Sequence, residues 1–198
     1  FLGLKREVSE DVDNTVRAII KDVRARGDAA LFELSSRFDG VDLGASGIRV
    51  KAEEVSAAMG ACDPETLAAL RLARDRIADY HTRQKPDAEL RYRDQLGVEL
   101  GHRWTAVESV GLYVPGGLAS YPSSVLMNAV PAKVAGVPRI VMVVPASKGH
   151  LNPLVLAAAE TAGVTEIYRI GGAQAIAALA YGTDTIAPVV KIVGPGNA

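Results

Sequence analysis

Strand-like and helix-like segments alternate through the second half of the chain. The strands are short, apolar and rich in β-branched residues, and turns separate them from the helices. The predicted strands are 109–114, 139–144, 166–170 and 189–193, and the predicted helices between them are 123–135, 153–162 and 172–181. Short apolar strands joined by helices are typical of a parallel sheet covered on both faces, with right-handed crossovers. The pattern therefore predicts an α/β fold with a Rossmann-like, mainly parallel sheet.

Helices dominate the first half. Apolar residues recur at helical spacing after Ser9, and Gly27 followed by Asp28 predicts the end of one helix and the start of the next. The sequence Asp-Pro-Glu at 63–65 places a cap residue, a proline and a carboxylate where a helix begins, so a long helix is expected to about residue 83.

A β-hairpin is expected over 90–104, where apolar and polar residues alternate. His102 shares the apolar phase of this hairpin, and we interpret it as a structural histidine with a hydrogen-bond partner. The expected domain organisation is a helical segment with the hairpin over 1–107, as part of a first domain, and a Rossmann-like nucleotide-binding domain over 108–198. The second domain is expected to be truncated at its C-terminal end. Because the chain begins at Phe1 and not at a methionine, further residues are expected before Phe1.

Composition narrows the class of protein. The 198 residues are 48% hydrophobic, enough for a core, and 22 basic against 23 acidic side chains give a net charge of -1 without a basic stripe. Nucleic acid is therefore not an expected partner. Cys62 is the only cysteine, which favours a reducing compartment. Because the sequence has neither a long apolar run nor a signal-peptide layout, we predict a cytoplasmic protein that does not bind membranes.

Three of the predicted strands end in glycine-rich turns: Pro115-Gly116-Gly117, Gly171-Gly172 and Gly194-Pro195-Gly196-Asn197. Glycine lets a ligand approach the backbone, and a helix that follows such a turn offers free N–H groups to a phosphate. Ligand crevices of open α/β sheets lie at this carboxyl edge. The turns predict a nucleotide or phosphate site, although neither G-x-G-x-x-G after the first strand nor a P-loop is present.

The polar side chains at these strand ends are all uncharged. They are Tyr113, Ser120, Ser123, Ser124, Asn128, Gln174 and Asn197. Such groups can orient an adenosine or ribose by hydrogen bonds but are poor at proton transfer. We interpret the two serines at 123 and 124 as helix caps, and Gln174 as a ligand contact. Histidines and carboxylates do not fall at metal-ligand spacing, so no metal-binding residue is predicted in this chain, and the uncharged strand-end residues do not predict a catalytic one.

The motifs around these turns resemble, in order, those of the histidinol dehydrogenase family. They are VGLYVPGG at 110–117, PSSVLMN at 122–128, PAKVAG at 131–136, GGAQAIAALA at 171–180 and KIVGPGN at 191–197, with VRARGDAAL at 23–31 near the start. The resemblance covers essentially the whole chain. It implies the N-terminal half of an enzyme whose fold is of the histidinol dehydrogenase and aldehyde dehydrogenase type.

The resemblance also implies a function. Members of this family are homodimers that use zinc and two NAD to oxidise L-histidinol to L-histidinal and then to L-histidine, in histidine biosynthesis. Tyr113, Gln174 and Asn197 correspond to NAD contacts. The zinc ligands and the acid–base residues of the family lie beyond the position of Ala198, so this chain by itself is expected to be inactive.

Two residues depart from the family pattern, and other functions stay open. Leu118 replaces a small polar residue, and Val190 replaces an aspartate before Lys191, which is expected to affect the last strand or its pairing. One alternative is a dehydrogenase of the same superfamily that acts on another alcohol, such as dihydroxypropanesulfonate. Another is a noncatalytic nucleotide-binding module.

Overall fold

The structure, a computed structural model, describes residues 10–116, 121–146 and 148–195. Its helices are α1 Glu10–Arg26, α2 Asp28–Asp39, α3 Leu43–Ser46, α4 Ala52–Ala61, α5 Pro64–Thr82, α6 Pro122–Ala135, α7 Pro153–Ala162 and α8 Gly172–Tyr181. Its strands are β1 Glu89–Arg93, β2 Glu99–Arg103, β3 Ser109–Tyr113, β4 Arg139–Val143, β5 Glu166–Tyr168 and β6 Lys191–Val193.

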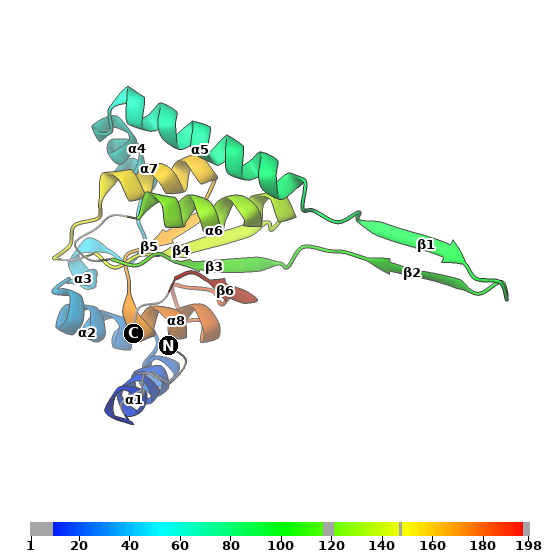
Figure 1. The fold of residues 1–198 in the computed structure, drawn as a ribbon. Coiled ribbons are helices and arrows are strands. Elements are labelled where there is room, and N and C mark those ends of the chain that lie inside the picture. The colour runs from blue at the N-terminus through cyan, green and yellow to red at the C-terminus, as the bar shows by residue number, and fades with distance from the viewer. Residues whose placement is uncertain (1–9, 117–120, 147, 196–198) are drawn as a thin grey trace, which may run out of the picture.

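Four strands form one parallel sheet in the order β5-β4-β3-β6. This confirms the predicted α/β fold with a mainly parallel sheet, and helices cover both faces (Figure 1). The chain first adds strands on one side of β3 and then returns to its other side with β6. The strand order thus reverses beside β3, and the carboxyl end of such a reversal is the usual place for a ligand crevice.

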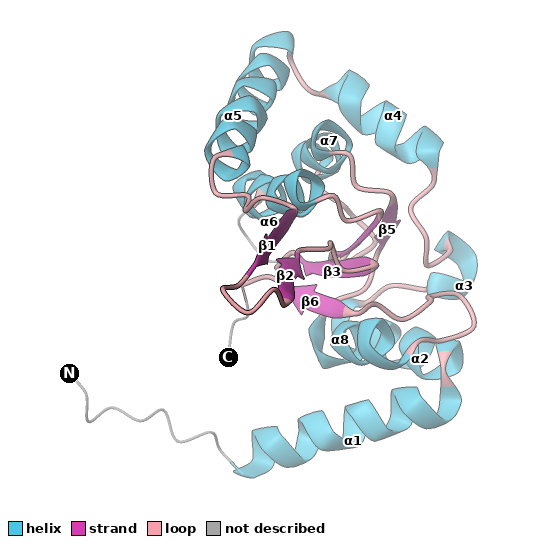
Figure 2. Ribbon diagram, turned by 90° about the vertical axis from the view of Figure 1, so that its right-hand side faces the viewer, coloured by secondary structure: helices cyan, strands magenta, loops and turns pink. Residues whose placement is uncertain are grey.

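Two hydrophobic cores lie on opposite faces of the sheet. Along β4, Ile140 and Met142 face the core beneath α4, α5, α6 and α7, whereas Val141 and Val143 face the core shared with α1, α2 and α8. All four side chains are fully buried, as the continuous apolar run of this strand predicts. The helices of the first half extend these two layers: α4 and α5 pack against α7 and α6 on one side of the sheet, and α1 and α2 pack against α8 on the other (Figure 2). The domain boundary at residues 107 and 108 stays a prediction.

A segment of the first half covers the outer edge of β5. Arg49 and Tyr168 form an antiparallel bridge, and the Val50 N–H donates to the Ile167 carbonyl oxygen at 2.9 Å. Pairing of this kind protects an otherwise open edge strand. It leads directly into α4, whose N-cap position is held by Lys51 and not by a usual cap residue. The Glu54 carboxylate accepts from the Lys51 N–H at 3.0 Å and so satisfies the start of this helix.

The hairpin β1–β2 extends away from both cores (Figure 1). β1 and β2 pair antiparallel, which confirms the predicted hairpin. Both strands are exposed along their whole length, so the described part of the body does not cover their apolar side chains. The hydrogen-bond partner expected for His102 is not found among the described residues, and the residue lies on an exposed strand. Its ring instead lies edge to face with that of Trp104, with centroids 6.3 Å apart.

Among the described residues, no helix is both long enough and apolar enough to cross a membrane.

Candidate functional site: a pocket at the ends of β3 and β6

A pocket of about 360 Å³ opens at the carboxyl ends of β3 and β6, beside the first turn of α8. Its walls come from these three elements and from α1. The lining residues are Val16, Tyr113, Gly172, Ala173, Ile176, Ile192, Val193, Gly194 and Pro195. This position matches the crevice that the glycine-rich strand ends predicted. The lining is mostly apolar, with one phenol and exposed backbone.

Tyr113 connects β3 to the start of α8. It is the last residue of β3, and its hydroxyl oxygen accepts a hydrogen bond from the Gly172 N–H at 3.2 Å. The first N–H groups of a helix have no partner within the helix, so the phenol satisfies one of them. Ala173, the next residue of this turn, lines the pocket. The phenol and the positive end of α8 therefore face one pocket, where they can orient a polar or anionic group.

Gly194 allows the end of β6 to approach Tyr113. Its φ is 146°, and a Cβ at this position would overlap the carbonyl oxygen of Tyr113. A side chain here is excluded both by the backbone conformation and by the close approach. The glycine that follows β6 therefore shapes the pocket wall, in agreement with the predicted role of this turn near a ligand.

The glycines after β3 and β5 have a packing role. Pro145, which follows β4, lies between Gly116 and Gly171, and a Cβ at either glycine would overlap the proline ring. Three neighbouring strand ends thus meet around one proline. These glycines permit close packing between turns, in addition to any approach of a ligand.

Gln174 is fully buried in the first turn of α8 and is not among the residues that line the pocket. Its Oε1 lies 2.6 Å from the point that a Cβ on Gly172 would occupy, so the side chain fills the space above the turn. Gly172 thus lies between the two residues: it donates to the Tyr113 hydroxyl, and the Gln174 side chain lies next to it. A direct ligand contact by the Gln174 side chain stays a prediction.

Of the remaining predicted polar residues, the structure places none of those that it describes at the pocket. The interpretation of Ser123 and Ser124 as caps was wrong: α6 begins at Pro122 with Tyr121 as its N-cap, so both serines lie inside the first turn. Pro122 has the fixed φ angle that a first helical residue needs, so the helix begins at Pro122, before both serines. Asn128 donates to the Ser124 carbonyl oxygen at 2.7 Å, within the helix. Ser120, Leu118 and Asn197 lie outside the described residues.

Val190 does not prevent pairing of the last strand. β6 pairs with β3 from Lys191 onward, and the Val190 side chain is 61% exposed. The expectation that this departure affects the strand therefore receives no support from the pairing.

Sequence reasoning missed the apolar part of the lining. Val16 belongs to the apolar stripe of α1, and Ile176 and Ile192 follow ordinary helix and strand patterns. Nothing in those patterns distinguishes a pocket residue from a core residue. Only the packing of α1 against α8 brings Val16 to the strand ends.

The pocket is suited to binding and not to proton transfer. None of its lining side chains carries a charge at neutral pH. Across the part of the chain that the structure describes, no three His, Cys, Asp or Glu side chains are placed to hold a metal ion. The described residues can therefore contact a nucleotide by hydrogen bonds and apolar packing.

Comparison with known proteins gives the family. The sequence model of the histidinol dehydrogenase family matches residues 4–198. The chain is 68% identical over 198 residues to the histidinol dehydrogenase of Rhizobium meliloti (strain 1021), and 69% identical to that of Bradyrhizobium diazoefficiens. All of this chain is covered in both comparisons, but only 45% and 46% of the relatives.

A solved structure agrees with the sequence comparison. The crystal structure of histidinol dehydrogenase from Elizabethkingia anophelis superposes with a TM-score of 0.89 at 35% identity, over 94% of this chain and 43% of that chain. The match therefore covers less than half of the relative, in sequence and in structure. Since the family model matches nearly every residue, and the order of strands and turns fits it, this chain belongs to the histidinol dehydrogenase family.

Proposed function

We propose that this chain supplies part of the nucleotide-binding region of an NAD-dependent histidinol dehydrogenase. The whole enzyme oxidises L-histidinol to L-histidine through L-histidinal, in histidine biosynthesis. The observation that carries the proposal is the pocket between Tyr113, the first turn of α8 and Gly194, at the carboxyl edge of the sheet. Membership of the family supports the choice of NAD over other nucleotides.

The size and chemistry of the pocket suit one part of NAD. A volume of about 360 Å³ is near the lower end of ligand pockets, which span roughly 300–1,000 Å³. That is room for a nucleoside-sized portion with the rest of the dinucleotide outside. The Tyr113 phenol and the first turn of α8 would orient its polar groups, and Ile176 and Ile192 would contact its apolar surface. Gln174 and Asn197 are the further NAD contacts in this proposal.

Other features of the enzyme belong to the same proposal and rest on the family resemblance. They are the use of two NAD per L-histidinol, a zinc ion that holds the substrate, a homodimer and a cytoplasmic location. The described residues do not offer a ligand set for zinc. The proposed zinc ligands and acid–base residues therefore belong to the part of the relatives' length that this chain does not span.

Calorimetric titration of this chain with NAD tests the binding role. We expect weak but saturable binding that Ala173→Leu reduces, because the larger side chain would fill the pocket. Ala180→Leu is the matched control: it lies in the same helix but is exposed and is not among the residues that line the pocket. No saturable binding, or equal binding by both variants, would contradict the proposal.

Activity separates the enzyme from its alternatives. A protein that spans the full length of the relatives should form NADH from L-histidinol and not from dihydroxypropanesulfonate, measured by NADH absorbance. The present chain should form none with either alcohol. Turnover of L-histidinol by this chain alone would refute the assignment of the catalytic residues to the part of the relatives that this chain does not span.

A further inference from the structure

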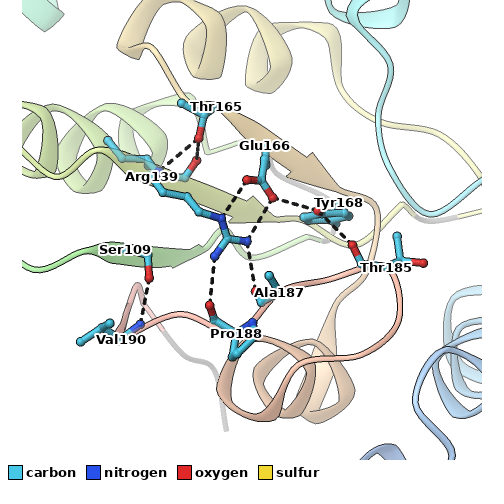
Figure 3. Close-up of polar contacts among 10 residues, drawn as sticks. Ser109, Arg139, Thr165, Glu166, Tyr168, Thr185, Ala187, Pro188 and Val190 are labelled. Atoms are coloured by element: carbon cyan, nitrogen blue, oxygen red, sulfur yellow. Dashed lines mark hydrogen bonds and ion pairs between the residues drawn. The ribbon is translucent and has the colours of Figure 1, made fainter.

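The connection between α8 and β6, residues 182–190, crosses the edge of the sheet opposite the pocket. It meets Tyr168, the last residue of β5, and then the first residues of β4 and β3 (Figure 3). The Tyr168 hydroxyl of β5 lies 3.4 Å from the Thr185 carbonyl oxygen. At the other end, the Val190 N–H donates to the Ser109 hydroxyl oxygen of β3 at 3.1 Å.

Arg139, the first residue of β4, holds the middle of this connection. Its Nη1 donates to the Pro188 carbonyl oxygen and its Nη2 to the Ala187 carbonyl oxygen, both at 3.0 Å. The same guanidinium donates to both carboxylate oxygens of Glu166, at 2.8 and 3.1 Å. One planar group thus joins two strands to two successive carbonyls, a geometry that the five N–H donors of arginine allow.

The ion pair between Arg139 and Glu166 is largely buried and has a further hydrogen bond from Tyr168. The Arg139 and Glu166 side chains are only 24% and 19% exposed, and the Tyr168 hydroxyl donates to Glu166 at 2.9 Å. Hydrogen bonding to Arg139 lowers the pKa of Glu166, and burial raises the pKa of Tyr168 to about 12. At neutral pH the carboxylate is therefore ionised and the phenol is a donor, as both contacts require.

The register of β6 depends on this connection. β6 has three residues and lies at the edge of the sheet, where it pairs with β3 from Lys191 to Val193. Val190 immediately precedes it, and Gly194 and Pro195, which line the pocket, immediately follow. A shift of one residue at the start of so short a strand would move both pocket residues and reverse the faces of the strand.

We propose that Arg139 is a positioning residue for the cofactor pocket: its contacts to the carbonyls of Ala187 and Pro188 fix the register of β6 and so the place of Gly194 and Pro195 beside Tyr113. This rests on the proposed NAD-binding function. The guanidinium acts from the amino edge of the sheet, about four strand residues or roughly 13 Å from the pocket, and does not touch the ligand.

Arg139→Lys tests the proposal, since the lysine ammonium keeps the charge but cannot reach four acceptors with a fixed planar fork. We expect faster amide hydrogen exchange in residues 187–193, with β4 and β5 protected as before. We also expect the Kd for NAD to rise about three- to thirtyfold, the range for residues that act on a site from a distance.

Arg169→Lys is the matched control. Arg169 is also a buried arginine in an ion pair, with Glu54 of α4 at 2.6 Å, but its other partner is the Arg49 carbonyl oxygen in the segment before α4. It should leave exchange in 187–193 and NAD affinity unchanged. Glu166→Gln is the second variant, for use if Arg139→Lys does not fold, and it should give the same local loss of protection in weaker form.

The outcomes separate the two proposals. Unchanged exchange in 187–193 would overturn the positioning role, as would faster exchange with an unchanged Kd. If the unsubstituted chain binds no NAD, the proposed function fails and no Kd can be compared. In that case, faster exchange in residues 187–193 of Arg139→Lys, but not of Arg169→Lys, would still show that Arg139 controls β6.

Discussion

At the scale of single residues, the pocket depends on positions where a side chain is excluded. Gly194 combines a positive φ with the close approach of Tyr113, and Gly116 and Gly171 allow three strand ends to meet at Pro145. The same residue type thus serves a pocket wall in one turn and turn packing in two others. Glycine at a strand end therefore indicates that another group lies close to the backbone. Whether that group is a pocket residue or a neighbouring turn depends on the tertiary structure.

Gly194→Ala should destabilise the chain by about 2 to 4 kcal/mol, the sum of a positive φ and an overlap with the Tyr113 carbonyl. Gly97→Ala is the control, because Gly97 has a φ of 83° with open space around it, and should cost about 1 kcal/mol. Urea unfolding measures both free energies. Equal losses would show that the approach to Tyr113 costs nothing.

At the scale of elements, the sheet and the hairpin contrast sharply. β3 and β4 are covered on both faces by helices, whereas β1 and β2 contact mainly each other. In the hairpin, Tyr92 pairs with Leu100 on one face, and Arg93 pairs with Glu99 on the other. The hairpin is amphipathic, and the described part of the body leaves its apolar face exposed.

Leu112→Ala and Leu100→Ala measure this contrast, since both replace a leucine within a strand. Leu112 is fully buried, and its truncation should cost about 2 to 5 kcal/mol. Leu100 is 41% exposed on the hairpin, and its truncation should cost less than about 1 kcal/mol. A loss of several kcal/mol at Leu100, measured by thermal unfolding, would contradict the independence of the hairpin.

At the scale of the whole molecule, a few ion pairs join segments that are distant in sequence. Arg169 and Glu54 connect β5 to α4, and Arg139 and Glu166 connect β4 to β5. Asp28, at the start of α2, contacts the Thr185 hydroxyl in the connection to β6. The contacts of Glu54 and Asp28 join helices of the first half to segments of the second, and the Arg139–Glu166 pair joins two strands of the sheet.

Glu166→Gln should reveal an acid-sensitive contribution to stability. Because the pKa of Glu166 is lower in the folded chain, its contribution is present above the ordinary carboxyl pKa of about 4.3 and is lost as pH falls through the folded value. The wild type should exceed Glu166→Gln by about 1.5 to 3 kcal/mol at neutral pH, and the difference should shrink below about pH 4.

Unfolding in urea from pH 3 to pH 7 measures this difference. Glu99→Gln is the control, because Glu99 lies on the exposed hairpin and contributes to neither core. A difference for Glu166→Gln that is constant with pH would show that the carboxylate charge does not stabilise the fold.

The local sequence predicted most elements of the fold. The apolar run at 139–144 indicated β4, and Asp63-Pro64 indicated the start of α5, with Asp63 accepting from the Thr66 N–H at 2.8 Å. The start of α4 was not predicted, since its N-cap is Lys51 and not Ser, Thr, Asp or Asn. The cap of α6 was assigned to serines, although Tyr121 holds that position.

For the site, the sequence by itself determined which turns could approach a ligand, because glycine and apolar periodicity are local properties. It placed Tyr113 and Gly194 at the correct edge of the sheet. Only the tertiary structure decided that Val16 of α1 lines the pocket and that Gln174 is buried beside it. It also decided that Arg139 reaches the connection 48 and 49 residues further along the chain. Contacts between distant segments depend on how the layers pack, and packing is not encoded at any single position.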